Sequence, residues 1–219
     1  VVAMLMPLAA IADSYTSLWK QFDSAMQKDH PQSALKVLAQ ITDKAQREHE
    51  YGQLLKAQVS IAGYETMMSP DSLLPAIERL KYAEQTAVSS GDNVLAAIYQ
   101  SVLGSVYTDN RRLLDDGVDI GKEYYAKSMA HPDALASAYA TGYEPFVVDG
   151  VDSKYYYDDL LHVIGMRAGD YCTMHDYYAS HGKREGALLT ALELVKKARR
   201  AGDEGRVKKS KYIMSLDSL

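Results

Sequence analysis

Two histidines and an aspartate are the residues of this sequence best placed to bind a metal ion. His175 is followed directly by Asp176, and His181 comes six positions after the first histidine. On an α-helix a six-residue separation turns two side chains to different faces, whereas a helical histidine pair that binds zinc is spaced by four residues. The stretch from Tyr177 to Gly182 is typical of a helix end and the turn after it. We therefore expect no metal site here and assign no cofactor to the chain.

Acidic residues are grouped in two other places, and neither group has the spacing of a known site. Residues 111–121 contain three aspartates, but they lack the alternating ligands and the glutamate that complete an EF-hand calcium loop. Asp158 and Asp159 are adjacent, so on a helix their carboxylates diverge and do not work together as general acid and base. We interpret the first group as a polar connector and predict no catalysis by the second.

The remaining reactive side chains also lack a catalytic setting. The sequence contains no glycine-rich phosphate loop, no Gly-x-Ser-x-Gly elbow and no His-Glu-x-x-His zinc motif. The single cysteine, Cys172, has no basic neighbour in sequence and no partner for an internal disulfide, so we expect a buried, unreactive thiol. His162 lies on the flank of an apolar helical face, where we expect a buried histidine with its hydrogen bonds satisfied. The sequence therefore predicts a protein that is not an enzyme.

The sequence begins with an apolar run, VVAMLMPLAAIA. Residues 10–12, Ala-Ile-Ala, fit the small-x-small pattern that signal peptidase recognises, with cleavage before Asp13. We interpret residues 1–12 as the remnant of a secretion signal and predict an exported protein of the periplasm or cell surface; the alternative is an N-terminal core helix. No later stretch approaches the ~20 apolar residues of a membrane-spanning helix, so we expect no integral membrane segment in the mature chain.

The apolar residues of 14–45 recur at helical spacing in two runs that a proline separates. Because proline suits a helix's first turn and disfavours helical geometry in the residue before it, Pro31 starts the second helix. Neither helix can bury its apolar face alone, so the pattern predicts an antiparallel hairpin stacked with others in a tetratricopeptide-like array or solenoid. The core faces consist of Tyr15, Leu18, Trp19 and Phe22 in the first helix, and of Leu38 and Ile41 in the second.

Helical periodicity continues along the chain and predicts an all-α fold. Further helices are expected near 50–68, 72–89, 123–130, 132–140, 155–171, 184–200 and 203–216, with another that ends near 109. We divide the chain into tetratricopeptide-like hairpins over 13–110 and a second helical part over 111–219 that packs on the first as one continuous domain. The predicted core residues outside the first hairpin are Leu55, Ile77, Leu80, Ile98, Leu160 and Ile164.

The C-terminal part of the chain is basic, although the whole chain carries a net charge of −5. Lysine and arginine predominate over residues 183–219, but the predicted export argues against nucleic acid as a partner. The 184–200 helix is expected to pack on the preceding helix through residues that include Leu188 and Leu192. The 203–216 helix presents an apolar strip for the next domain or a second copy of the chain, formed by Val207, Tyr212, Ile213 and Leu216.

Tyrosine is unusually frequent, with 17 tyrosines against 2 phenylalanines. A tyrosine can fill an apolar groove while its hydroxyl reaches water or a backbone carbonyl, which suits thin layers of helices. Packing is therefore our first interpretation of these rings. The alternative is an exported glycan-binding or glycan-processing helical protein that uses surface tyrosines, Tyr155, Tyr156 and Tyr157, as sugar platforms.

Several short patterns along the chain are shared with one protein family. They include Tyr15-x2-Leu18-Trp19-Lys20, Tyr51-x2-Leu54-Leu55-Lys56-Ala57 and Tyr143-Glu144-Pro145-Phe146. Through them, residues 13–200 resemble the N-terminal tetratricopeptide-like helical region of large bacterial alpha-2-macroglobulin-like proteins. The resemblance implies a non-catalytic exported scaffold or protein-interaction module of a protease-inhibitor-type protein. Its partner would be the following domains of a longer parent chain or an exported protein.

The sequence departs from this family in two ways. The thioester motif Cys-x-Glu-Gln is absent, since Cys172 is followed by Thr-Met-His, and a bait region is absent too. The family's proteins are far longer, whereas this sequence stops before any β-rich region, so a fragment, a truncated relative and a free-standing module all remain open. Protease trapping is therefore not assigned to these residues.

Overall fold

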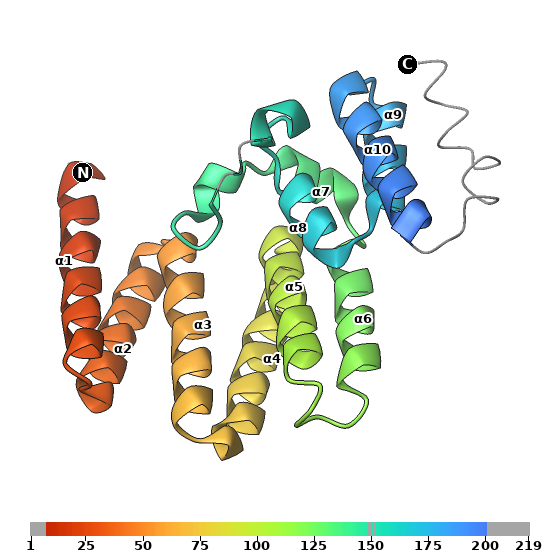
Figure 1. Cartoon of the computed structure of the whole chain (residues 1–219). Helices are drawn as coiled ribbons and strands as arrows, with labels where there is room; N and C mark the ends of the chain where they lie inside the picture. Colours follow the sequence, from red (N-terminus) through yellow and green to blue (C-terminus); the bar gives the residue numbers. More distant parts are fainter. Residues whose placement is uncertain (1–7, 149, 151, 201–219) are drawn as a thin grey trace. The chain divides into compact units, whose positions relative to one another are not determined.

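The computed structural model describes residues 8–148, 150 and 152–200 (Figure 1). These residues form ten α-helices and three short 3₁₀ helices, and their only β-structure is an isolated antiparallel bridge between Tyr139 and Asp159. The predicted all-α fold is therefore confirmed. The α-helices are α1 (Leu8–Gln27), α2 (Pro31–Glu48), α3 (Tyr51–Met68), α4 (Leu73–Ser90), α5 (Asn93–Asp109), α6 (Gly117–Ser128), α7 (Pro132–Ser137), α8 (Leu160–Ala168), α9 (Tyr171–Ser180) and α10 (Arg184–Arg200). The 3₁₀ helices are η1 (Pro70–Ser72), η2 (Ala140–Tyr143) and η3 (Ser153–Tyr156).

The chain folds as two compact units. The first unit contains the described residues up to Ala76 together with Gly142–Val147, and the second contains Ile77–Thr141 and the described residues from Val148 onward. From the sequence we predicted a division near residue 110, at the polar connector. In the structure that connector joins α5 to α6, which pack closely against each other within the second unit. The loss of periodicity there marks a turn between two partner helices.

In the first unit α1, α2 and α3 follow one another as antiparallel neighbours (Figure 1). Local chemistry explains the α1–α2 turn: Asp29 adopts a left-handed backbone conformation, the N–H of His30 donates to the carbonyl of Ala25, and Pro31 opens α2. Leu18, Trp19 and Phe22 are half-buried and pack against the core of this unit. That core consists of the buried side chains of Tyr15, Leu38, Ile41, Ala45, Leu54 and Ala57.

Residues 142–147 join the first unit through a close backbone contact with the start of α3. A Cβ atom on Gly52 would lie 1.9 Å from the carbonyl oxygen of Glu144 and 2.6 Å from the carbonyl carbon of Tyr143. Only glycine allows so close an approach. Val147, at the end of the segment, is buried. The first unit is therefore built from two stretches that are distant in sequence.

The second unit is organised around α5, in which every residue from Ala96 to Ser105 is buried. Its contact with α6 is close because glycines lie on both helices: a Cβ on Gly121 would approach the carbonyl oxygen of Gly104 to 2.9 Å. From Ile77 onward α4 belongs to this unit, and the side-chain amide of Gln100 on α5 donates a hydrogen bond to the carboxylate of Glu84 on α4. The predicted core residues of the later helices in both units are all buried: Leu55, Ile77, Leu80, Ile98, Leu160 and Ile164.

The helix predicted over 155–171 is divided in the structure. The 3₁₀ helix η3 ends at Tyr156, Tyr157 and Asp158 both adopt left-handed backbone conformations, and α8 begins at Leu160. The bridge to Tyr139 draws this stretch out of helical geometry. The apolar residues here have the spacing of one long helix, but this tertiary contact interrupts it.

The contact between α9 and α10 depends on small side chains. The ring of Tyr178 lies 3.0 Å from the position that a Cβ on Gly186 would occupy, so the two helices approach closely. Leu188 and Leu192, which the sequence predicted to pack on the preceding helix, are instead exposed. Because the helices are so close, α10 packs on α9 through its small residues, and these two leucines face away from α9. The buried residues of α10 are Gly186, Ala187, Thr190 and Ala191.

Candidate functional site

A groove in the first unit is formed by α1, α3 and the 142–147 segment. Its volume of about 380 Å³ lies within the range of roughly 300–1,000 Å³ that is typical of ligand pockets. Most of the side chains along it are exposed or half-buried. The lining residues are Tyr15, Thr16, Trp19, Lys20 and Asp23 from α1, Gln53 and Lys56 from α3, and Pro145.

Trp19 is the central side chain of this groove. Its indole N–H donates to the Oε1 atom of Gln53 over 2.7 Å, which ties α1 to α3. The ammonium of Lys56 lies over the indole ring, 4.5 Å from its centroid, in a cation–π contact. The edge of the ring packs at 87° against Phe22, 5.8 Å between centroids. These three contacts hold the indole ring in place at the groove.

Tyr15 is buried at one side of the groove, and its hydroxyl is hydrogen-bonded within the protein. It donates to Oε2 of Glu48 over 2.8 Å, and the ammonium of Lys44 lies 4.4 Å above the tyrosine ring. Burial raises the pKa of Tyr15, and the Glu48 carboxylate raises it further. The hydrogen bond from Lys44 lowers the pKa of Glu48. These three side chains satisfy one another and stabilise the wall of the groove.

In the second unit a buried carboxylate joins α8 to α9. Asp159, only 2% exposed, accepts hydrogen bonds at Oδ1 from the backbone N–H of His162 and from the hydroxyl of Tyr178, both over 2.9 Å. The ammonium of Lys183 lies 3.6 Å from Oδ2. Asp159 is thus the N-cap of α8 and the anchor of α9.

The electrostatics of this cluster follow from its burial. Desolvation raises the pKa of Asp159, and the hydrogen bonds from His162 and Tyr178 and the charge of Lys183 lower it in part. Burial also raises the pKa of Tyr178, and the adjacent carboxylate raises it further. The ammonium of Lys183 also faces the ring of Tyr157, 4.6 Å from its centroid. Asp159 lines neither of the two pockets described here, and each of its contacts holds helices together.

The histidines considered as metal ligands do not come together. His175 is buried with Nδ1 3.4 Å from Oδ1 of its neighbour Asp176. His181 is exposed, stacks on Tyr177 at 4.1 Å between ring centroids, and has its Nε2 3.7 Å from Asp133. In the described part of the chain no three His, Cys, Asp or Glu side chains are grouped so as to hold a metal ion.

The three tyrosines proposed as a sugar platform have different surroundings. Tyr156 is buried and stacks against the histidine of α8, with 4.2 Å between ring centroids. Tyr155 is exposed, but Lys154 lies over its ring at 4.8 Å. Tyr157 is half-buried beneath the ammonium of Lys183. The rings therefore do not form one exposed aromatic surface.

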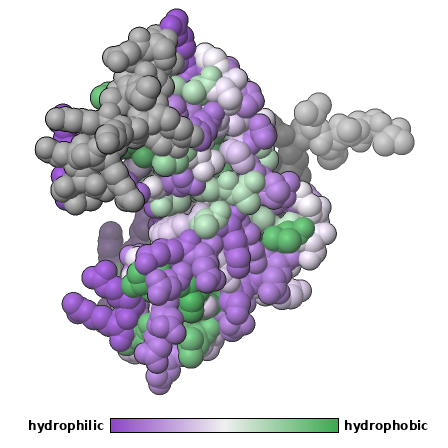
Figure 2. Space-filling model, turned by 90° about the vertical axis from the view of Figure 1, so that its right-hand side faces the viewer, coloured by the Kyte–Doolittle hydropathy of each residue, from purple (hydrophilic) through white to green (hydrophobic). Residues whose placement is uncertain are grey.

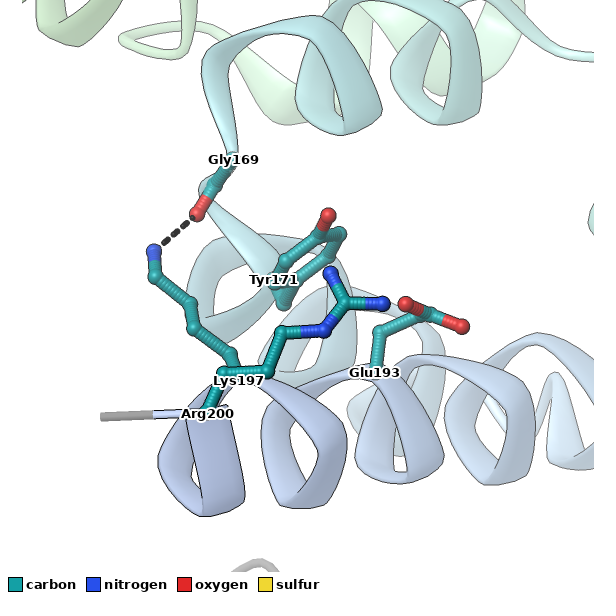
Figure 3. A pocket seen from close by; sticks show the side chains of 5 residues that line it. All are labelled: Gly169, Tyr171, Glu193, Lys197 and Arg200. Carbon is teal, nitrogen blue, oxygen red and sulfur yellow. Dashed lines mark hydrogen bonds between the residues drawn. The ribbon is translucent and has the colours of Figure 1, made fainter. Parts of the chain in front are cut away.

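A smaller pocket of about 230 Å³ lies where the α8–α9 turn meets the end of α10 (Figure 3). Lys197 donates to the carbonyl oxygen of Gly169 over 2.9 Å, and its ammonium faces the ring of Tyr171 at 5.5 Å. Figure 3 shows the guanidinium of Arg200 pointing toward the carboxylate of Glu193. Charges of opposite sign thus face each other across this pocket.

The single cysteine lies at the surface. Cys172 is exposed on α9, so the prediction of a buried thiol was wrong. The buried residues of this helix are Met174, His175 and Tyr178.

On the face shown in Figure 2, hydrophilic residues predominate and hydrophobic residues form small separate patches. None of the described helices is both long and apolar enough to cross a membrane. The predicted partner surface, Val207, Tyr212, Ile213 and Leu216, lies outside the described residues.

Most of the polar groove residues were not singled out in the sequence. Thr16, Lys20 and Asp23 are spaced by four and three residues, so they form a polar stripe along α1 beside the apolar one. Gln53 and Lys56 have the same relation on α3. These two polar stripes, one of them beside the single tryptophan, were the sequence pattern from which the groove residues could have been recognised.

No protein-family model matches this sequence, and neither the curated proteins nor the solved structures that were searched contain a significant match to it. The resemblance to alpha-2-macroglobulin-like proteins therefore remains a prediction from the sequence patterns.

Proposed function

We propose that this chain is a non-catalytic interaction module of an exported protein, and that the α1–α3 groove binds a segment of protein. One observation carries this proposal: the groove presents a fixed indole ring and several polar side chains on an exposed surface. The buried polar cluster around Asp159, by contrast, is used to hold helices together. A preformed groove with mixed apolar and polar lining is typical of a binding site.

The proposed parent is a bacterial alpha-2-macroglobulin-like protein with tetratricopeptide-like hairpins at its N-terminus. Support comes from the antiparallel succession of α1, α2 and α3, and from the positions of the groove residues in the sequence. Five of the eight lining residues fall within the patterns that carry the family resemblance: Tyr15, Trp19, Lys20, Lys56 and Pro145. The bound segment would then belong to the following domains of the parent or to an exported partner.

Selection from a random peptide display library tests this function. The wild-type chain is compared with Thr16→Tyr, which places a large side chain in the groove, and with Ser17→Tyr, a matched change at the adjacent exposed position outside it. We expect wild type and Ser17→Tyr to enrich the same peptides and Thr16→Tyr to lose them. Failure of the wild type to enrich any peptide, or equal enrichment by Thr16→Tyr, would overturn the proposal.

A further inference from the structure

The hydrogen bond between Trp19 and Gln53 determines which groups the groove offers to a ligand. An indole N–H can only donate, so Gln53 must turn its carbonyl oxygen toward Trp19. The NH₂ group at the other end of the same amide carries two donors, and Gln53 lines the groove. The groove therefore contains a donor whose orientation is fixed by the tryptophan beside it.

Two lysines add positive charge next to this amide. Within the part of the chain that the structure describes, neither Lys20 nor Lys56 forms an ion pair, and no acidic residue stands three or four positions from Lys56. The cation–π contact with Trp19 nevertheless holds the Lys56 ammonium in place. Other helical lysines of the chain are paired with a carboxylate three or four residues away: Lys44–Glu48, Lys81–Glu78, Lys122–Asp119 and Lys196–Glu193.

The rest of the lining is mainly apolar. The half-buried ring of Trp19 and the pyrrolidine of Pro145 provide surfaces on which an apolar side chain can pack, whereas Tyr15 is buried and its hydroxyl is bonded to Glu48. We propose that the groove binds an extended peptide segment in which an Asp or Glu side chain adjoins an apolar one. The carboxylate is held by Lys20, Lys56 and the Gln53 amide, and the apolar neighbour packs beside Trp19 and Pro145.

Asp23 limits what this groove accepts. It is the one carboxylate among the lining residues and is exposed at the edge of the site, three positions from Lys20. A ligand with several adjacent acidic residues would place like charges together, which disfavours binding. The inferred ligand therefore carries a single acidic residue within an otherwise uncharged segment.

This inference rests on the proposed function and is tested with defined peptides on the full chain. Trp19 is the only tryptophan, so its emission reports directly on the groove. The probe is acetyl-Ser-Leu-Glu-Pro-Val-Ser-amide, compared with the same peptide carrying Gln in place of Glu. We expect a saturable change in emission with the Glu peptide. The Gln peptide should bind about tenfold more weakly, as for the loss of one charge-assisted hydrogen bond. Added salt should weaken binding of the Glu peptide alone.

Matched variants separate charge from fold. Lys20→Met and Lys56→Met keep the aliphatic stems and should each weaken the Glu peptide about tenfold. Lys36→Met, on an exposed lysine of α2 outside the groove, should not change binding. Asp23→Asn should tighten it. Urea unfolding curves identify any variant that fails to fold, in which case Lys→Gln at the same position replaces it.

The outcomes distinguish this inference from the function on which it depends. Equal binding of the Glu and Gln peptides, or unchanged binding after both lysine substitutions, would overturn the acidic-ligand inference. If peptide display still selects groove-dependent sequences, the interaction function stands and only the ligand class is wrong. If neither probe peptide binds and display enriches nothing, both proposals fail.

Discussion

Replacing Gly52 by alanine should destabilise the first unit by about 2 kcal/mol. The added Cβ would lie 1.9 Å from the carbonyl oxygen and 2.5 Å from the carbonyl carbon of Glu144, whereas carbon atoms in contact are normally about 3.5–4.0 Å apart. Both atoms belong to the backbone, so no side-chain rotation relieves the overlap, and the 142–147 segment must move by about 1 Å or more. Such overpacking costs roughly 1–3 kcal/mol.

Two further terms limit this magnitude. Alanine in place of glycine favours a helix by at most about 1 kcal/mol, which offsets part of the cost. If the 142–147 segment detaches altogether, the unit loses the burial of Val147, which is worth roughly 1.5–3 kcal/mol. Whether the 142–147 segment shifts to make room for the new Cβ or detaches from α3, the first unit should lose about 2 kcal/mol of stability.

The same helix supplies the control. A Cβ on Gly63, also in α3, would meet no atom within 4 Å, so Gly63→Ala should stabilise by roughly 0.5–1 kcal/mol. Urea unfolding followed by the emission of Trp19 measures both variants, because that residue lies in the same unit. The expected order of midpoints is Gly63→Ala above wild type and Gly52→Ala below it. A Gly52→Ala protein as stable as Gly63→Ala would show that the segment does not pack on α3.

Three other predictions concern the second unit. Asp159→Ala should cost about 2–4 kcal/mol in urea unfolding, since it removes a helix cap worth roughly 0.5–2 kcal/mol and leaves the buried Tyr178 hydroxyl without its acceptor. An Asp159→Ala protein with wild-type stability would contradict the anchoring role. Burial raises the pKa of Tyr156 from 10.0 to about 12, so the folded state keeps a proton that the unfolded chain releases, and stability should fall as pH rises from about 10 to 12. Tyr156→Phe should make that fall shallower; an unchanged slope in alkaline unfolding curves would refute the assignment. Finally, the exposed Cys172 should react with a thiol reagent such as DTNB in the native protein, and reaction only after denaturation would count against its position.

Local sequence patterns were sufficient to predict the structure where residues close in sequence determine it. The α1–α2 hairpin could be predicted because apolar residues at helical spacing and a proline at the start of α2 both act within a few residues. Leu38 and Ile41 are buried for the same reason. Trp19 shows the limit of this reasoning, because its spacing placed it in the core and its indole N–H is instead bonded at the groove.

The differences arise where contacts between distant residues decide the outcome. Neither Tyr157 nor Asp158 is a glycine or a proline, yet both adopt left-handed backbone conformations that interrupt the predicted helix. The cause is the bridge between the next residue, Asp159, and Tyr139. On α10, size alone favoured burial of the leucines, but the fit of Gly186 against Tyr178 selected another face. The groove itself could not be predicted, since it requires α1, α3 and Pro145 to be brought together.

The position of residues 142–147 has a consequence for the order in which the first unit is formed during synthesis. Its three helices leave the ribosome early, but the segment that covers the start of α3 emerges only after the intervening residues 77–141. Until then the backbone around Gly52 is exposed, and the α1–α3 groove lacks the wall that Pro145 provides. A nascent chain therefore gains a complete groove only when its second unit is already partly made. The same connectivity means that an expression fragment ending at residue 76 or 110 would contain α1, α2 and α3 without the complete groove.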